Sequence, residues 1–531
     1  MALIQALEFF EQLVGTSYPF DTFKIVFTDA IYAQSLIGSS FAIMNVALLV
    51  PETVIDQVYE TRAALCNALA KQWFGHYVAP ASPHDIWVIV GFIGWLTNQF
   101  LKKLHGVNED KFRSMKDMER VCMIDINLLP LCPTNIDLPN AVWPEFQPLY
   151  PEEDPASLRS ELFLLKGPLV LSMLEKRMGK GLLQKIANKV MVSTMSGELP
   201  NGFSTLSFLK IARKISGKLE IKEFADQWIF GSGCPIFTIS YHFNRKKMVI
   251  ELKIKQKCSN EGVEGCTPKF TGPFTVRVQE PGGTFDTEVK IEEFVQQYDI
   301  IYHTKYKRIR RNPTKKSKKQ FAQDDEDDDD QMDEGEDEGE SKQDLDKTEQ
   351  SSDMKIEEPD RITFEWIRLD PETFWLCHKT FVQDDFMWNS ILKKDKEIGG
   401  QYEAIVALSK MRNLATCNTL TAIIKDPSYF YRLRVEAVMC MINYDLAELE
   451  DVGLTNLVKI LRDQYFTDIT GTYMPKRCDF ENFQDYFIRN AIIVAITRIR
   501  GKDGWSSPMV RKILYDFLSL NDNTHNLVFS G

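Results

Sequence analysis

The spacing of apolar residues changes twice along the chain. Up to residue 233, apolar residues recur every three or four positions, which predicts amphipathic helices; the segment 162–179 is one example. From residue 234 the period becomes two, which predicts β-strands at residues 236–241, 247–257, 274–280, 284–292 and 361–369. From residue 386 the helical period returns, at residues 401–411, 416–425, 430–444, 455–465, 486–500 and 507–520.

These changes of period predict an α+β multidomain chain with three parts. Residues 1–233 form a mostly helical domain, residues 234–382 a small β-sandwich, and residues 383–531 a solenoid of short paired helices that resemble HEAT repeats. A length of 531 residues and a hydrophobic content of 44% suffice for three packed cores. The chain opens on an amphipathic helix, and the solenoid has no evident polar cap, so we expect a fragment or a short form of a longer protein.

The charge is concentrated in one polar insert. Residues 324–340 contain thirteen acids and no base, and residues 305–319 contain nine Lys or Arg residues. Without the acidic block, the formal net charge of −12 becomes +1. Such blocks cannot bury apolar surface, so residues 306–358 are predicted to be a disordered loop that interrupts the sandwich. The basic block is typical of a nuclear import signal or a nucleic-acid arm, and a passive linker whose two halves pair with each other is the alternative.

Composition also excludes several classes of protein. No run of eighteen or more apolar residues occurs, so no membrane span is predicted, and the first residues lack the basic start of a signal peptide. The ten cysteines include no C-x-x-C pair, which is typical of buried thiols in a reducing compartment rather than of a disulfide framework.

The stretch 64–95 carries the most specific motif. The corner Q-W-F-G at residues 72–75 joins two apolar helices, and D-I-W at 85–87 and G-F at 91–92 follow. This order resembles the zinc aminopeptidase (gluzincin) family, in which an H-E-x-x-H helix precedes the corner and the next helix supplies a glutamate ligand. Two histidines four residues apart share one helix face, so both can bind one Zn²⁺, and the glutamate between them acts as general base.

The resemblance preserves the frame of this site but not its ligands. The two histidine positions fall on Asn67 and Lys71, the general base on Ala68, and the third ligand on Val90. An amide is a poor zinc ligand, an ammonium group repels the cation, and alkyl side chains offer no lone pair, whereas a catalytic zinc needs three ligands and a water. The family's catalytic tyrosine falls on Leu164. We therefore predict a retired active site with no metal, no cofactor and no catalytic residue.

Two further segments match the family in position but lack its functional residues. Residues 38–43 take the place of its Gly-Ala-Met-Glu-Asn strand, and no acid occurs between residues 31 and 50. L-L-K-G at residues 164–167 matches the turn after the catalytic tyrosine. With the chemistry gone, Trp73, Phe74 and Trp87 are predicted to be core residues that lock the two former site helices together.

A thermolysin-like domain, a β-sandwich and a helical solenoid follow one another in the same order in zinc aminopeptidases. Three motifs narrow the match further: F-N-R-K-K at residues 243–247, W-I-R-L-D-P at 366–371 and D-F-M-W at 385–388. Together with the lost ligands, they resemble the TBP-associated factors of TFIID that are built on a dead aminopeptidase scaffold. The resemblance implies a nuclear, non-catalytic scaffold that contacts TBP, other TBP-associated factors and core-promoter DNA near the initiator. A dead-peptidase adaptor outside transcription and an active peptidase with an unorthodox site are the alternatives.

Six basic residues are candidates for DNA contact. Three of them alternate with apolar residues along the strand at 247–257, so they share its outer face. The other three lie where the preceding turn leads into this strand, with Lys247 as its first residue. The six are Arg245, Lys246, Lys247, Lys253, Lys255 and Lys257. An ordinary solvated lysine face is the alternative interpretation.

Overall fold

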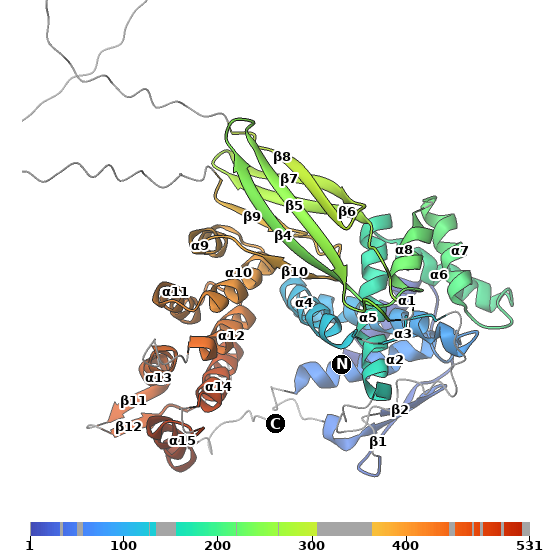
Figure 1. Ribbon diagram of the computed structural model, residues 1–531. Coiled ribbons are helices and arrows are strands. Elements are labelled where there is room, and N and C mark those ends of the chain that lie inside the picture. Colours follow the sequence, from blue (N-terminus) through green and yellow to red (C-terminus); the bar gives the residue numbers. More distant parts are fainter. Residues whose placement is uncertain are drawn as a thin grey trace, which may run out of the picture.

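The computed structural model shows three parts joined by one continuous hydrophobic core (Figure 1). It describes residues 2–31, 35–49, 57–126, 128–133, 155–218, 220–263, 265–304, 364–444, 452–469, 472–477, 482–500 and 504–522. The predicted insert, residues 306–358, lies outside the described residues.

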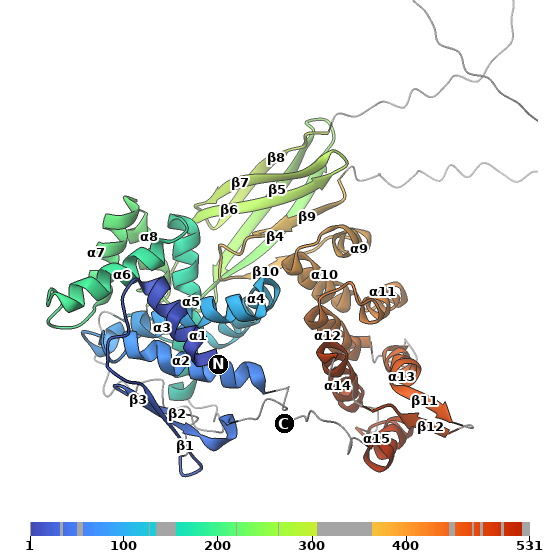
Figure 2. The ribbon, with the colours of Figure 1, turned by 180° about the vertical axis from the view of Figure 1, so that it is seen from behind.

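The first part is a helical domain with a small sheet at one edge (Figures 1 and 2). The sheet has the order β1-β3-β2 and consists of β1 (Lys24–Thr28), β2 (Ser35–Gly38) and β3 (Phe41–Asn45). The helices are α1 (Ala2–Val14), α2 (Val58–Trp73), α3 (Ile86–His105), α4 (Val107–Ile124), α5 (Pro155–Met178), α6 (Leu182–Met195), α7 (Thr205–Ser216) and α8 (Ile221–Trp228). None of the described helices is long and apolar enough to cross a bilayer.

Helices α3 and α5 approach each other closely at two glycines. A Cβ atom at Gly167 would lie 3.2 Å from the carbonyl oxygen of Trp87 and 3.3 Å from the Cα of Gly91. A larger side chain at this crossing would push the helices apart. The close approach sets where α5 lies along α3, and with it the positions of Leu164 and Lys166, which precede Gly167 on α5.

The second part is a sandwich of two sheets, as the period of two predicts. One sheet has the order β10-β4-β5-β8 and the other the order β7-β6-β9. Phe237 on β4 and Phe274 on β6 meet across the sheets with 5.6 Å between ring centroids, and Trp375 packs against both rings. The strands are β4 (Pro235–Asn244), β5 (Val249–Cys258), β6 (Gly272–Glu280), β7 (Gly283–Ile291), β8 (Val295–Ile301), β9 (Trp366–Leu369) and β10 (His378–Phe381).

The third part is a column of short helices beside the first domain (Figures 1 and 2). The helices are α9 (Asp385–Lys394), α10 (Ile398–Met411), α11 (Leu414–Lys425), α12 (Tyr431–Cys440), α13 (Val452–Tyr465), α14 (Phe483–Arg498) and α15 (Pro508–Leu520). The predicted helix 430–444 ends at Cys440 and continues as a 3₁₀ turn. A hairpin that the sequence analysis does not predict, β11 (Phe466–Ile469) and β12 (Thr472–Pro475), follows α13.

Candidate functional site: the former active-site cleft

The Q-W-F-G corner at the end of α2 is bonded to the small sheet through its glutamine. Gln72 is fully buried; its Oε1 accepts a hydrogen bond from the Ser40 amide at 2.8 Å, and its Nε2 donates to the Gly38 carbonyl at 3.1 Å. Both backbone groups lie at the β2–β3 turn, within the segment that takes the place of the family's Gly-Ala-Met-Glu-Asn strand. The corner therefore fixes α2 to the small sheet, but it supplies none of the family's catalytic or metal-binding residues.

The aromatic residues of this frame are fully buried, which confirms that Trp73, Phe74 and Trp87 are core residues. Phe74 stacks on Phe92 of α3 with 4.7 Å between ring centroids, so it joins the two former site helices directly. Trp73 instead packs against rings from α1 and the segment after it. Trp87 packs against Phe208 of α7. Of the three residues, Phe74 therefore makes the direct ring contact to α3, and the two tryptophans pack against other neighbours.

The former ligand positions have surroundings that do not suit a cation. Ala68 is fully buried against the small sheet, and Val90 lies in the main core. Asn67 and Lys71 are half-buried on α2. The zinc ion that the fold family uses does not fit this set, because one amide oxygen and a repelling ammonium group replace its ligands. Among the described residues, no three His, Cys, Asp or Glu side chains are grouped so that they could hold a metal ion.

A cavity of about 560 Å³ remains where α4 and α5 face the sandwich and the helical column. Its volume is in the range of small-molecule sites, but its lining combines apolar and oppositely charged side chains from all three parts. It includes Asn67, Arg113, Leu164, Lys176, Arg368 and Arg432.

Glu109 on α4 lines this cavity and links α4 to the helical column. Its Oε1 lies 2.7 Å from Arg113 Nε on the same helix and 2.9 Å from an Arg432 guanidinium nitrogen on α12. Burial alone raises the pKa of Glu109, but hydrogen bonds and charges from Arg432 and Arg113 outweigh it and hold the pKa below its ordinary value. The helical column is therefore joined to the first domain by a paired, partly buried charge.

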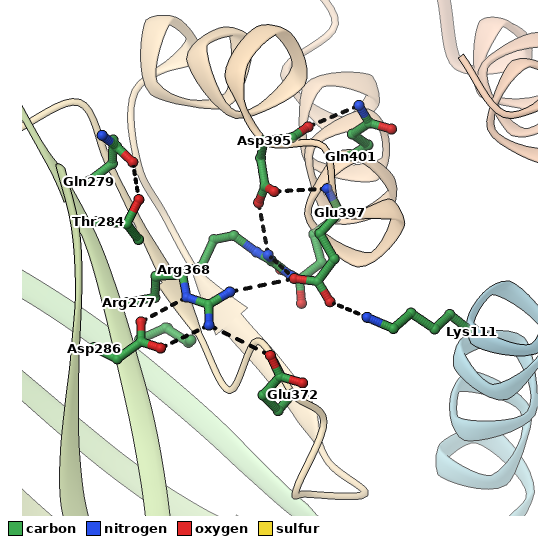
Figure 3. A network of polar contacts seen from close by, with 12 residues as sticks. Lys111, Arg277, Gln279, Thr284, Asp286, Arg368, Glu372, Asp395, Glu397 and Gln401 are labelled. Carbon is green, nitrogen blue, oxygen red and sulfur yellow. Dashed lines mark hydrogen bonds and ion pairs between the residues drawn. The ribbon is translucent and has the colours of Figure 1, made fainter. Parts of the chain in front are cut away.

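Arg368 on β9 forms a second junction (Figure 3). Its side chain is 1% exposed, and the guanidinium lies 2.8 Å from Asp395 Oδ2 and 2.7 Å from Glu397 Oε2, both between α9 and α10. Lys111 on α4 reaches the other oxygen of Glu397 at 2.8 Å (Figure 3). Glu397 thus connects all three parts. The W-I-R-L-D-P motif alone does not predict this role for its arginine.

A third charged pair is buried where the first domain meets the sandwich. Lys166 on α5 is 1% exposed, and its Nζ lies 2.6 Å from Oδ2 of Asp125, which is fully buried. The Nζ is also 3.5 Å from the Gly233 carbonyl, just before β4. The L-L-K-G motif that contains Lys166 does not predict this pairing. The signal that could have revealed it is a single lysine inside the apolar run L-F-L-L-K-G-P-L-V-L.

The six predicted DNA-contact residues are all exposed, but they form two groups rather than one. Lys253, Lys255 and Lys257 form a row on the outer face of β5. The group Arg245, Lys246 and Lys247 occupies the β4–β5 turn. Glu251 lies between the groups and faces Asp299 across the strand pair, and its carboxylate binds Asn244 Nδ2 at 2.8 Å and Lys247 Nζ at 3.7 Å.

Three family models match the chain in sequence order. A "Peptidase family M1 domain" matches residues 2–228, a "TAF2 Ig-like domain" residues 232–384, and "TAF2-like, TPR repeats" residues 385–530. A solved structure, aminopeptidase A of Legionella pneumophila in complex with aspartic acid, has a TM-score of 0.56 and is 12% identical over 94% of this chain and 52% of that one. At this identity, the match shows the fold alone.

Curated relatives are similar over nearly the whole chain. TFIID subunit 2 of Schizosaccharomyces pombe is 33% identical over 99% of the chain, that of Gallus gallus 29% over 99%, and that of Saccharomyces cerevisiae 27% over 98%. The chain covers 46%, 43% and 39% of these relatives, which is less than half of their length. From the order of the three domains and these similarities, the chain belongs to the family of TFIID subunit 2, in which a peptidase M1 fold is followed by an Ig-like sandwich and helical repeats.

Proposed function

We propose that the chain acts as a non-catalytic scaffold subunit of TFIID in the nucleus, where it supports recognition of the core promoter at the initiator and assembly of the RNA polymerase II pre-initiation complex. The observation that carries the non-catalytic part is the set Asn67, Ala68, Lys71, Val90 and Leu164 at the five positions of the family's chemistry. The relatives' shared name supports the assignment to transcription initiation.

Copurification from nuclear extract tests the assembly. We expect affinity-tagged chain in its full-length context to bring down TBP and TBP-associated factors in stoichiometric amounts, because the proposal makes it a structural subunit. A dead-peptidase adaptor outside transcription would bring down other proteins and leave TBP behind. Identification of the captured proteins by mass spectrometry distinguishes the two.

The purified protein is expected to contain no stoichiometric zinc and to cleave no aminoacyl reporter, because its former ligand positions offer no ligand set. Elemental analysis and a fluorogenic peptidase assay check this. The variant with Asn67→His, Ala68→Glu, Lys71→His and Val90→Glu serves as the comparison: whatever metal it takes up is expected to restore no turnover, since Leu164 still lacks a phenol. One chelator-sensitive zinc per wild-type chain would contradict the proposal.

We also propose the lysine row on β5 as a contact for the DNA backbone. Lys253, Lys255 and Lys257 are two residues apart, which spaces them by about 6.8 Å along the strand. Polar Ser240 and Gln297 flank Lys253 in the sheet register and can donate hydrogen bonds to phosphates. The turn cluster is the weaker candidate, because Glu251 already pairs with Lys247.

Replacing the three row lysines with alanine is expected to reduce the slope of log K against log salt by about 2.7, since each phosphate contact contributes about 0.9. Electrophoretic mobility shifts with core-promoter duplex between 50 and 200 mM salt measure this slope. The matched control replaces Arg245, Lys246 and Lys247 with alanine and is expected to change it less. Unchanged affinity and slope in the row variant would mean that the row is an ordinary solvated face.

A further inference from the structure

The hairpin of α6 and α7 carries a strongly basic surface that none of the sites above includes. Residues 180–218 contain seven Lys or Arg residues and one acid, Glu198. The hairpin lies at the periphery of the first domain, on the side away from the helical column (Figures 1 and 2). Its charge is therefore not part of the junctions that hold the three parts together.

Each helix of the hairpin presents an exposed stripe of residues spaced by three or four positions, which places them on one helix face. The two stripes contain three basic and three large apolar residues that are all exposed. We call them the α6–α7 surface: Lys189, Val192, Met195, Leu206, Lys210 and Lys214.

The two stripes lie on helices that pack against each other, with Glu198 in the loop between them. Lys189 Nζ lies 3.5 Å from Glu198 Oε2, in the loop between the helices. A hydrogen bond from Ser193 and the charges of Lys189 and Lys214 together hold the pKa of Glu198 below its ordinary value. Lys189 belongs to α6 and Lys214 to α7.

The apolar members gather at the loop end of the hairpin. Val192 and Met195, in the last turn of α6, are 45% and 66% exposed, and Leu206, in the first turn of α7, is 64% exposed. These three large side chains are exposed at the same end of the hairpin and offer apolar surface that a protein partner could cover. The surface thus combines an apolar end with a basic remainder.

We propose that the α6–α7 surface binds an acidic amphipathic segment of a partner protein, in which Asp or Glu residues are interspersed with large apolar residues. Its carboxylates would pair with Lys189, Lys210 and Lys214, and its apolar side chains would cover Met195 and Leu206. Charge complementarity selects an acidic partner. The exposed apolar end favours a protein over DNA, whose backbone is bound mainly through phosphate contacts.

A fluorescein-labelled 20-residue peptide in which Glu and Asp alternate with Leu and Phe is the probe, titrated with the whole chain by fluorescence anisotropy. The paired variant Lys210→Glu and Lys214→Glu is expected to weaken binding about tenfold or more, because two attractions become repulsions. The variant Met195→Ser and Leu206→Ser is expected to weaken it severalfold. The matched control Lys410→Glu and Lys425→Glu, at exposed positions in the last turns of α10 and α11, is expected to bind as the wild type does.

A second peptide, with Ser in place of every Leu and Phe, separates the contribution of charge to binding from that of apolar contact. It is expected to bind more weakly than the first peptide. The proposal is overturned if the α6–α7 variants bind the first peptide as tightly as the wild type, or if both peptides bind equally. It is also overturned if a 20-base-pair duplex competes better than unlabelled peptide, which would make this a nucleic-acid surface. All substituted residues are exposed, and the test does not depend on the proposed role in TFIID, since it needs no TFIID component.

Discussion

Replacing Lys166 with methionine is expected to lower the free energy of unfolding by ~3–5 kcal/mol, the usual cost of breaking a buried ion pair by removing one partner. Asp125 is fully buried, and its Oδ1 has no hydrogen-bond partner even in the intact pair. Without the ammonium group 2.6 Å from Oδ2, this carboxylate would be an uncompensated charge in the core. Urea unfolding followed by tryptophan fluorescence measures the change.

The double variant Lys166→Met and Asp125→Leu separates charge from packing. Removing both charges together is often neutral or even stabilising, so the double variant is expected to recover most of the lost stability. A double variant as unstable as Lys166→Met alone would show that the shape of the lysine chain, rather than its charge, is what this core requires. The pair would then be a packing feature.

The changes in hydrophobic period predicted the three parts of the fold because each part has a large apolar face of its own. Alternation along β5 and the helical period in α10 to α15 follow directly from one-sided burial. The strand β8 escaped prediction because it is a sheet edge, where Gln296, Gln297 and Asp299 interrupt the alternation and Ile300 is its one buried residue. Where few residues of a strand are buried, the spacing of its apolar residues does not predict the strand.

The loss of the family's active site could be predicted from the sequence, because a position that corresponds to a ligand either holds a ligand or does not. The charged junctions were not legible in this way. Glu109 and Arg432 are 323 positions apart, and Lys111 and Glu397 are 286 apart, so no local pattern connects them. A charged residue also looks the same in sequence whether it is solvated or buried. Lys166 and Arg368 became noticeable once the packing of three domains had placed them.

These junctions give the former cleft a structural role. In the fold family, the cleft has to admit a substrate. Here, Glu109, Lys111 and Arg368 lie around it and tie the first domain to the sandwich and the helical column. Fixed domain geometry suits the proposed scaffold, which has to hold its partners at set distances. If the active site is lost as predicted, catalysis does not require the cleft to stay free of such bridges. The proposal of a non-catalytic scaffold and the observed bridges are therefore consistent with each other.

Replacing Arg368 with methionine is expected to cost ~3–5 kcal/mol of unfolding free energy, because two carboxylates would lose a buried cation at once. The guanidinium is 1% exposed and bonds Asp395 and Glu397. The control is Arg277→Met on the neighbouring strand β6 (Figure 3). Arg277 also lies 3.6 Å from Glu397 Oε2, so this control removes a longer and more exposed contact to the same carboxylate. Arg277 binds Asp286 with both nitrogens at 2.7 and 2.8 Å, but its side chain is 20% exposed and that of Asp286 45%. Its loss is therefore expected to cost about 1 kcal/mol or less.

The pH dependence of the stability loss in Arg368→Met tests whether the lost charge causes it. Burial alone raises the pKa of Glu397, but hydrogen bonds from Lys111 and Arg368 outweigh it and hold the pKa below its ordinary value. In the wild type, this group therefore contributes stability above its unfolded pKa and loses it as the pH falls through the folded pKa. Without Arg368, burial has a larger effect on the Glu397 carboxylate. Its charged form then destabilises the folded state at neutral pH, and protonation removes this destabilisation. The stability difference between wild type and Arg368→Met should accordingly shrink from pH 7 toward pH 4, whereas a difference that stays constant would assign the loss to packing alone.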